Sequence, residues 1–143
     1  MPSLTFKPKI FNLSKKNEKN ELDLLTNSNP QLIILDELKS QIYEYVKLSN
    51  PTLVNNESQL KNKFDSFIAS INLEEYGNWV FYPWSNKLIR TLPEEEFIQV
   101  RTIRNKYKIT HEEQDKLRLK CVGIVGLSVG QSVSLAIAME RIA

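Results

Sequence analysis

The chain has 143 residues, of which 41% are hydrophobic and 25% charged, an ordinary composition for a folded, water-soluble protein. Its 19 basic and 17 acidic residues give a net charge of +2, which offers no electrostatic case for binding nucleic acid. The single cysteine, Cys121, excludes an internal disulfide, and no apolar run is long enough to cross a bilayer. We therefore expect a cytoplasmic protein with neither nucleic-acid nor membrane partners.

The first 29 residues are polar. Asn and Lys are abundant from Asn12 to Asn29, and this composition predicts a loop or a partly disordered segment. We therefore take residues 1–29 as a polar N-terminus that precedes the folded region.

Two helices and a hairpin are predicted over residues 30–100. Apolar side chains at three- and four-residue spacing indicate one helix that ends before Asn50-Pro51, and a second over residues 57–73. The run from Leu32 to Leu35 suits a strand as well, so the start of the first helix stays open. The two stripes, which we expect to pack together, consist of Leu35, Leu38, Ile42 and Val46, and of Leu60, Phe64, Phe67, Ile68 and Ile71.

Aromatic and β-branched residues then predict a hairpin. Trp79–Tyr82 and Lys87–Leu92 read as its strands, and Ser85-Asn86 supplies the turn. An isolated hairpin is marginal in water, so it must pack on other elements. We expect its aromatic residues to form core rather than a ligand platform; they are Tyr76, Trp79, Phe81, Tyr82 and Trp84.

Two further helix starts follow. Pro93 with Glu94–Glu96 fits the first turn of a helix, and Arg101 and Arg104 then lie on one side of it. Thr110 and Glu113 match a capping box that opens a short helix to about residue 120. His111 is the only histidine of the chain, which excludes a metal site built from several histidines.

From Cys121 the pattern changes to that of a nucleotide-binding unit. Cys121–Val125 predicts a buried parallel strand, residues 126–132 a turn of small residues, and Val133–Ile142 an apolar helix. Backbone N–H groups at such a helix start can hold phosphate oxygens. The overall fold class is therefore α/β, or α+β overall, with an incomplete Rossmann-like domain over residues 101–143.

The glycine fingerprint of that turn is partial. Only Gly126 occupies its place in G-x-G-x-x-G, because Ser128 and Gln131 replace the second and third glycines and Gly130 lies one residue early. The acidic residue that normally follows about 20 positions later falls past Ala143. On these residues alone, a strand, turn and helix that bind nothing remains an equal alternative.

The order of these segments resembles the start of ThiF-type adenylating domains, the fold of ubiquitin-activating enzymes. The likeness rests on Arg101-Thr102-Ile103-Arg104, on Glu113-Gln114-x-x-Leu117 and on the following strand and turn. Residues 76–84 and 123–133 further resemble a bacterial subgroup in which a helical region precedes the ThiF domain and a nitroreductase-like domain sometimes follows it.

The resemblance implies a specific chemistry. It implies ATP with magnesium as cofactor, a carboxylate such as the C-terminus of a small ubiquitin-like protein as co-substrate, and a homodimer. It assigns Arg104 and its neighbour Arg101 to the triphosphate. The nucleotide would lie on the turn, at Gly126, Leu127, Ser128, Gly130 and Gln131.

The resemblance also sets limits. The Asp, Arg and Lys residues that complete the family's ATP and magnesium site come after the turn, beyond this chain, so we expect no adenylation by this polypeptide alone. We further expect the unpaired strand and helix to expose apolar surface and to promote self-association. Two alternatives remain: a fragment of an oxidoreductase that binds NAD or FAD, and a helical interaction module without enzymatic activity.

Overall fold

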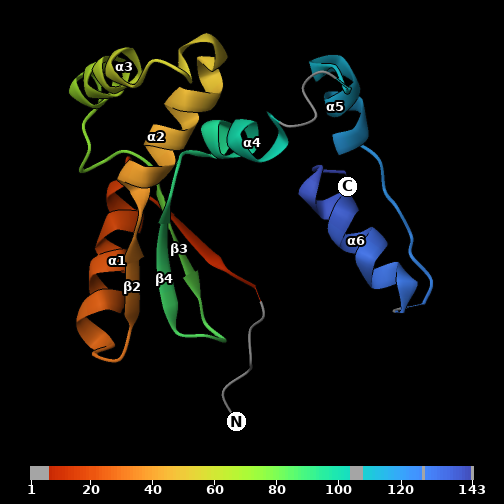
Figure 1. Cartoon of the computed structure of the whole chain (residues 1–143). Coiled ribbons are helices and arrows are strands. Elements are labelled where there is room, and N and C mark those ends of the chain that lie inside the picture. The colour runs from red at the N-terminus through yellow and green to blue at the C-terminus, as the bar shows by residue number, and fades with distance from the viewer. Residues whose placement is uncertain (1–6, 104–107, 127, 143) are drawn as a thin grey trace. The chain divides into compact units, whose positions relative to one another are not determined.

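The computed structural model describes residues 7–103, 108–126 and 128–142. The chain forms two compact units, Met1–Phe97 and Ile98–Ala143, which are described separately below. Helices and one four-stranded mixed sheet make up the described residues, so the predicted mixed α/β class is confirmed (Figure 1). No helix in these ranges is both long and apolar enough to span a bilayer.

The sheet of the first unit has the strand order β1-β3-β4-β2. Its centre is the predicted hairpin of β3 (Asn78–Tyr82) and β4 (Lys87–Thr91), which pair antiparallel. Strand β1 (Lys9–Asn12) adds to β3 antiparallel, and β2 (Ile33–Asp36) adds to β4 parallel. The hairpin is therefore held by two outer strands as well as by helices, which explains how it is stable.

The N-terminal segment corrects one expectation. Residues 16–28, predicted as loop, form helix α1 (Lys16–Ser28), which lies beside the sheet (Figure 1). The Asn12 N–H donates to Glu18 Oε2 at 2.6 Å and ties the helix start to β1. A few apolar residues are enough to hold this helix against the sheet, because they pack on apolar side chains of the strands. The core beneath it consists of Phe11, Leu13, Leu22 and Leu88, with Leu25, Leu32, Trp79 and Phe81 packed against them.

The choice left open at residues 32–35 is settled by pairing. Ile33–Asp36 is a strand, and helix α2 (Leu38–Ser49) starts after it, with the Leu38 N–H donating to Asp36 Oδ1 at 3.2 Å. The predicted stop before Pro51 is confirmed, and a 3₁₀ turn, η1 (Pro51–Leu53), leads onward.

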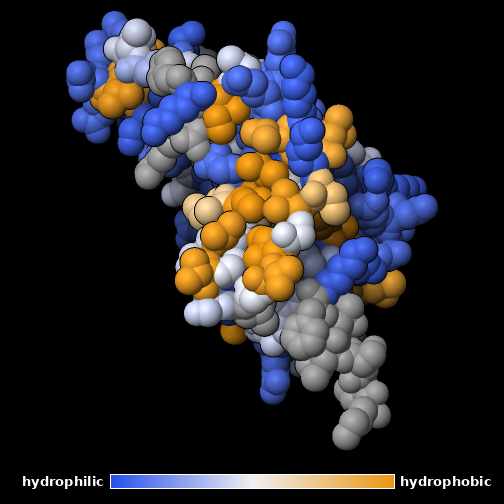
Figure 2. Space-filling model, turned by 90° about the vertical axis from the view of Figure 1, so that its right-hand side faces the viewer, coloured by the Kyte–Doolittle hydropathy of each residue, from blue (hydrophilic) through white to orange (hydrophobic). Residues whose placement is uncertain are grey.

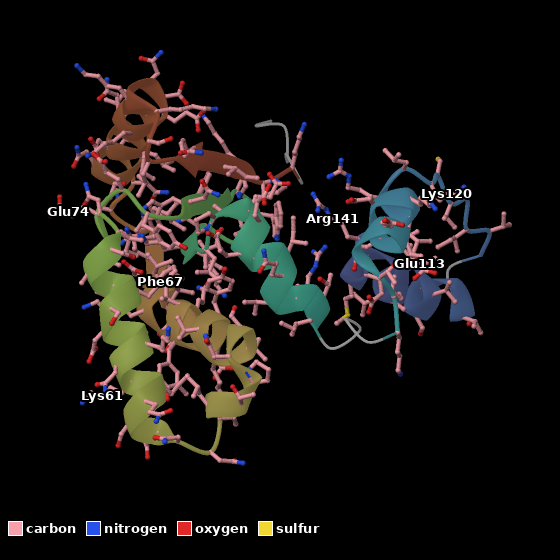
Figure 3. All side chains as sticks on the ribbon, turned by 90° about the horizontal axis from the view of Figure 1, so that it is seen from above. Lys61, Phe67, Glu74, Glu113, Lys120 and Arg141 are labelled. Atoms are coloured by element: carbon pink, nitrogen blue, oxygen red, sulfur yellow. The ribbon has the colours of Figure 1, made fainter. Side chains whose placement is uncertain are left out.

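Helix α3 (Glu57–Ser70) packs against α2, as the two stripes predict. Phe67 lies on the side of α3 that faces α2, whereas Lys61 lies on the outer side (Figure 3). The ring of Phe67 contacts that of Tyr45 on α2 edge-on, with 5.8 Å between centroids. The buried side chains of this second layer are Leu38, Ile42, Val46 and Leu60.

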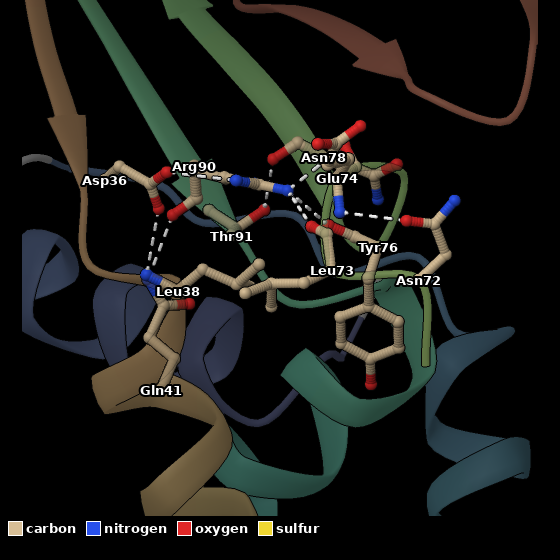
Figure 4. A network of polar contacts seen from close by, with 10 residues as sticks. All are labelled: Asp36, Leu38, Gln41, Asn72, Leu73, Glu74, Tyr76, Asn78, Arg90 and Thr91. Atoms are coloured by element: carbon tan, nitrogen blue, oxygen red, sulfur yellow. Dashed lines mark hydrogen bonds and ion pairs between the residues drawn. The ribbon is translucent and has the colours of Figure 1, made fainter. Parts of the chain in front are cut away.

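Arg90 on β4 fastens the segment before the hairpin to the sheet (Figure 4). Its Nη2 donates to the carbonyl oxygens of Leu73, Glu74 and Tyr76, and its Nη1 lies 3.0 Å from Asp36 Oδ2. One guanidinium thus joins three backbone carbonyls to a carboxylate on β2. No sequence pattern predicted this network.

Three shorter helices complete the described chain. Helix α4 (Glu94–Thr102) begins with the predicted acidic turn, and Glu96 Oε1 accepts a hydrogen bond from the Tyr76 hydroxyl at 3.2 Å. Burial and this carboxylate raise the pKa of Tyr76. Helix α5 (His111–Arg118) carries the predicted capping box, and helix α6 is Val129–Met139.

Candidate functional site

The segment that enters the glycine turn is not a strand in this structure. Cys121–Gly126 follows α5 without regular secondary structure, which corrects the predicted strand Cys121–Val125. A parallel strand forms only when a neighbour supplies its hydrogen bonds. None of the strands in the described part of the chain pairs with this segment. The apolar run therefore has the right composition for a strand but lacks a partner here.

Two glycines shape the turn in different ways. Gly126 has φ +91°, a conformation that glycine adopts without strain, and a Cβ placed on it would meet no described atom within 4 Å. Gly130 lies so close to the entering segment that a Cβ would come within 2.9 Å of Ile124 Cγ2. A tight turn and a close helix contact are two of the three tasks of glycine in dinucleotide-binding fingerprints.

Helix α6 starts earlier than expected. It begins at Val129 instead of Val133, which places Gly130 and Gln131 in its first turn instead of in the loop. The hydroxyl of the N-cap residue, Ser128, makes no capping hydrogen bond, and the first turn holds no acidic side chain. The first N–H groups of an α-helix have no partner within the helix, so this end can donate to an anionic oxygen.

The predicted arginines are placed only in part. Arg101 lies in the last turn of α4 and is exposed. Arg104 and Leu127 fall outside the described residues. Of the predicted nucleotide-binding residues the structure describes Gly126, Ser128, Gly130 and Gln131, which lie before the start of α6 and in its first turn.

Apolar side chains remain at the surface around this turn. Val125 is 101% exposed, and Leu135 on α6 is 63% exposed. Val129, Val133 and Met139 on the same helix are also exposed. Hydrophobic side chains are visible at the surface in Figure 2. The exposed apolar surface that we expected for an unpaired strand and helix is thus present.

One internal contact ties α6 to α5. The Gln114 side-chain amide donates to the Glu140 carbonyl oxygen at 2.9 Å. Gln114 belongs to the segment that carries the ThiF resemblance. Its hydrogen bond helps to position the C-terminal end of α6.

A hollow of about 280 Å³ lies beside the start of α2. Its lining includes four charged residues, Asp36, Glu37, Lys39 and Arg90. Asp36 and Arg90 are bonded to each other and to the backbone, so we assign this ion pair to the fold. Within the described ranges, no group of three or more His, Cys, Asp or Glu residues lies together in a way that could hold a metal ion.

Comparison with known proteins assigns no family. No family profile matches the chain, and no solved structure matches it significantly. An uncharacterized protein of Mycobacterium tuberculosis (strain CDC 1551 / Oshkosh), MT1398, is 41% identical over 68 residues. The match covers 48% of this chain and 10% of that protein, so the chain corresponds to a small part of its relative.

Proposed function

We propose that this chain supplies the start of a ThiF-type adenylating domain, and that the turn at Gly126 receives a phosphate of ATP. The observation that carries the proposal is the pair of glycines. Gly126 opens the turn with positive φ, and Gly130 lets α6 approach Ile124. The start of α6 that follows has no side-chain cap, so an anionic oxygen can accept from its N–H groups.

The proposed reaction is the activation of a carboxylate. A carboxylate oxygen of the acyl substrate attacks the α-phosphorus of ATP, a new P–O bond forms, and the bond to the β-phosphate breaks. Pyrophosphate leaves with the electron pair, and an acyl-adenylate remains. The substrate is the C-terminus of a ubiquitin-like protein or a small acid, and the enzyme acts as a cytoplasmic homodimer. ATP carries magnesium, for which the described residues offer no ligand group.

The charge distribution supports a polyanionic ligand in this unit. Residues 98–143 contain eight Lys and Arg against four Asp and Glu, whereas residues 1–97 contain 11 against 13. Arg101 and Arg104 belong to the basic group. A guanidinium pairs well with phosphate oxygens and offsets charge that develops on them. We assign both arginines to the triphosphate, with Arg104 as the residue in direct contact.

Nucleotide titration of the whole chain tests the proposal. We expect ATP to bind, and Gly126→Ala to weaken binding about tenfold, which equals about 1.4 kcal/mol. Gly123→Ala is the matched control, because a Cβ at Gly123 also meets no described atom within 4 Å while its φ is not positive. That variant should retain its affinity to within about twofold, or about 0.4 kcal/mol.

The alternatives give different results in the same titration. Binding of NAD or FAD in preference to ATP would identify an oxidoreductase fragment, since a turn of this kind can also hold the pyrophosphate group of a dinucleotide. A folded sample that binds none of the three nucleotides would favour an interaction module and contradict the proposal. Equal affinity of Gly123→Ala and Gly126→Ala for ATP would place the nucleotide elsewhere.

A further inference from the structure

Strand β2 forms one edge of the four-stranded sheet and is exposed along its whole length. Ile33, Ile34 and Leu35 are 48%, 49% and 40% exposed. Three consecutive large apolar side chains at a sheet edge are unusual, because such an edge offers both apolar surface and unpaired backbone groups to another strand.

The outward backbone groups of β2 can be assigned from its pairing with β4. The Ile33 N–H donates to the Asn86 carbonyl oxygen at 3.0 Å, so Ile33 bonds toward β4. Backbone groups alternate sides along a strand, so the N–H and C=O of Ile34 point away from the sheet. No other strand in the described part of the chain pairs with that side.

Strand β2 is as short as β1, with four residues, but it lacks two other usual protections of an edge. It contains neither lysine nor proline, and its one charged side chain, Asp36, is held by Arg90 at 3.0 Å. The opposite edge, β1, does carry a lysine, Lys9, which pairs with Glu21 at 2.6 Å. The two edges therefore differ, and β2 is the one suited to accept a strand.

We propose that β2 pairs with β2 of a second copy of this chain, antiparallel about a two-fold axis at Ile34. In this register Ile34 faces Ile34 of the second copy, and Ile33 and Leu35 face each other across the axis. Ile33, Ile34 and Leu35 each meet an apolar side chain, Asp36 faces Leu32 at the end of the pairing, and no like charges meet, so the apolar part of the strand is self-complementary. The pairing closes a dimer with a continuous eight-stranded sheet, whereas β1 joined to β2 would build an open chain of copies.

This inference does not depend on the proposed nucleotide site, since β2 belongs to the other unit. It also differs from association through the apolar surface of α6, which would leave β2 unpaired. An experiment must therefore report on the register of β2 as well as on the mass of the particle.

Cysteine cross-linking reports on the register. Cys121→Ser removes the single native cysteine, and Ile34→Cys is added to this background. Two residues 34 that face each other as a hydrogen-bonded pair have Cα atoms about 5.5 Å apart, within the range for a disulfide. We expect mild oxidation to convert most of the Ile34→Cys chains to dimer. Ile10→Cys, on the opposite edge and at a position 60% exposed against 49% for Ile34, should remain mostly monomeric.

A proline variant tests the backbone pairing itself. Ile34→Pro removes the outward N–H but leaves the bonds from Ile33 and Leu35 to β4, whereas Ile34→Thr keeps the N–H and the strand preference. We expect sedimentation equilibrium to show a dimer dissociation constant at least about tenfold higher for Ile34→Pro than for Ile34→Thr. Circular dichroism checks that both variants keep their secondary structure.

Each of several outcomes would overturn the proposal. The first is an unmodified chain that stays monomeric at high concentration. The second is cross-linking that is equally efficient at residues 10 and 34. The third is a dimer whose dissociation constant is the same for Ile34→Pro and Ile34→Thr, which would place the interface elsewhere, such as on α6.

Discussion

The two units of this chain differ in what their apolar residues contact. Every buried hydrophobic side chain that the structure describes lies between Phe11 and Leu92, in the first unit. The second unit has a more apolar helix, α6, yet leaves Leu135 and Met139 more than half exposed. A hydrophobic sequence therefore does not by itself produce a core; the first unit has one because its sheet brings distant segments together.

The difference follows from the strands. In the first unit β1 and β2 come from either side of α1, and the hairpin inserts between them to complete the sheet. In the second unit Cys121–Val125 has no such partner among the described residues. The first unit thus has the features of a self-sufficient fold, and the second those of a segment that presents a turn and an apolar helix.

The largest effect is expected when a leucine is replaced by alanine in each of the two units. Leu38→Ala in α2 removes a side chain that is 1% exposed, while Leu135→Ala in α6 removes one that is 63% exposed. We expect Leu38→Ala to lower the free energy of unfolding by about 3 kcal/mol, through lost burial and a residual cavity. Leu135→Ala should change it by less than about 0.5 kcal/mol.

Urea unfolding followed by circular dichroism measures both values. Comparable losses for the two variants would mean that α6 is buried in solution, either in the chain or in an assembly. That result would contradict the contrast between the units.

Local signals in the sequence predicted much of the first unit. The periodic stripe of α2, the stop before Pro51 and the turn at Ser85-Asn86 all act over a few residues, and the structure contains each of them. In the second unit the Thr110 capping box is of the same kind and is confirmed. These features are set by neighbours in sequence, so their patterns can be read there.

Features that depend on distant residues were missed or misplaced. Helix α1 was predicted as loop because Asn and Lys are abundant in its sequence, whereas the burial of its Leu22 depends on the more distant Phe11 and Leu88. The guanidinium of Arg90 reaches carbonyls 14 to 17 residues away, which no short motif signals. The predicted strand at Cys121–Val125 failed for the same reason, because pairing with another segment decides whether a strand forms.

At the candidate site the sequence predicted the turn but not the helix boundary. Small residues at Ser128, Gly130 and Gln131 were read as a loop, although Val129 already begins α6. The contact of Gly130 with Ile124 was not foreseen. The sequence feature that could have predicted this contact is the four-residue spacing between Gly126 and Gly130. This spacing places Gly130 in the first turn of α6, next to the segment that enters the turn.

An intermediate effect is expected from the two glycines with positive φ. A Cβ at Gly77 would come within 2.4 Å of the Thr91 carbonyl oxygen, while one at Gly126 meets open space. Gly77→Ala suffers both backbone strain and a clash with backbone, so we expect a loss of about 2 kcal/mol or more in unfolding free energy. Gly126→Ala suffers only the strain, about 1 kcal/mol, within the second unit.

Thermal unfolding of the two alanine variants makes the comparison. If Gly126→Ala is the more destabilising, the space beside Gly126 is filled in solution. The turn would then be a packed structural element instead of an open binding surface.

The smallest expected effect is on pH dependence, where one carboxylate in each unit holds a helix start. The backbone N–H of Asn12, with Lys15, lowers the pKa of Glu18 below its ordinary value of 4.5. The backbone N–H and hydroxyl of Thr110 lower the pKa of Glu113 in the same way. A carboxyl whose pKa is lowered by folding stabilises the folded state above its unfolded pKa, and this contribution is lost as the pH falls through the folded value.

Acid titration should therefore loosen both helix starts below about pH 4.5, with different consequences in the two units. Protonation of Glu18 loosens the start of a helix whose Leu22 still packs with Phe11 and Leu88, so the amides of α1 should stay protected from exchange. Helix α5 has no comparable buried side chain described, so its amides should lose protection once Glu113 is protonated. NMR of the glutamate carboxyl carbons and of amide exchange measures both, with Glu18→Gln and Glu113→Gln as controls that remove the titrating group. A pKa at or above 4.5 for either glutamate would contradict the hydrogen bonds that hold its helix start. Equal loss of protection in α1 and α5 would show that the packing of the two helices does not differ as described.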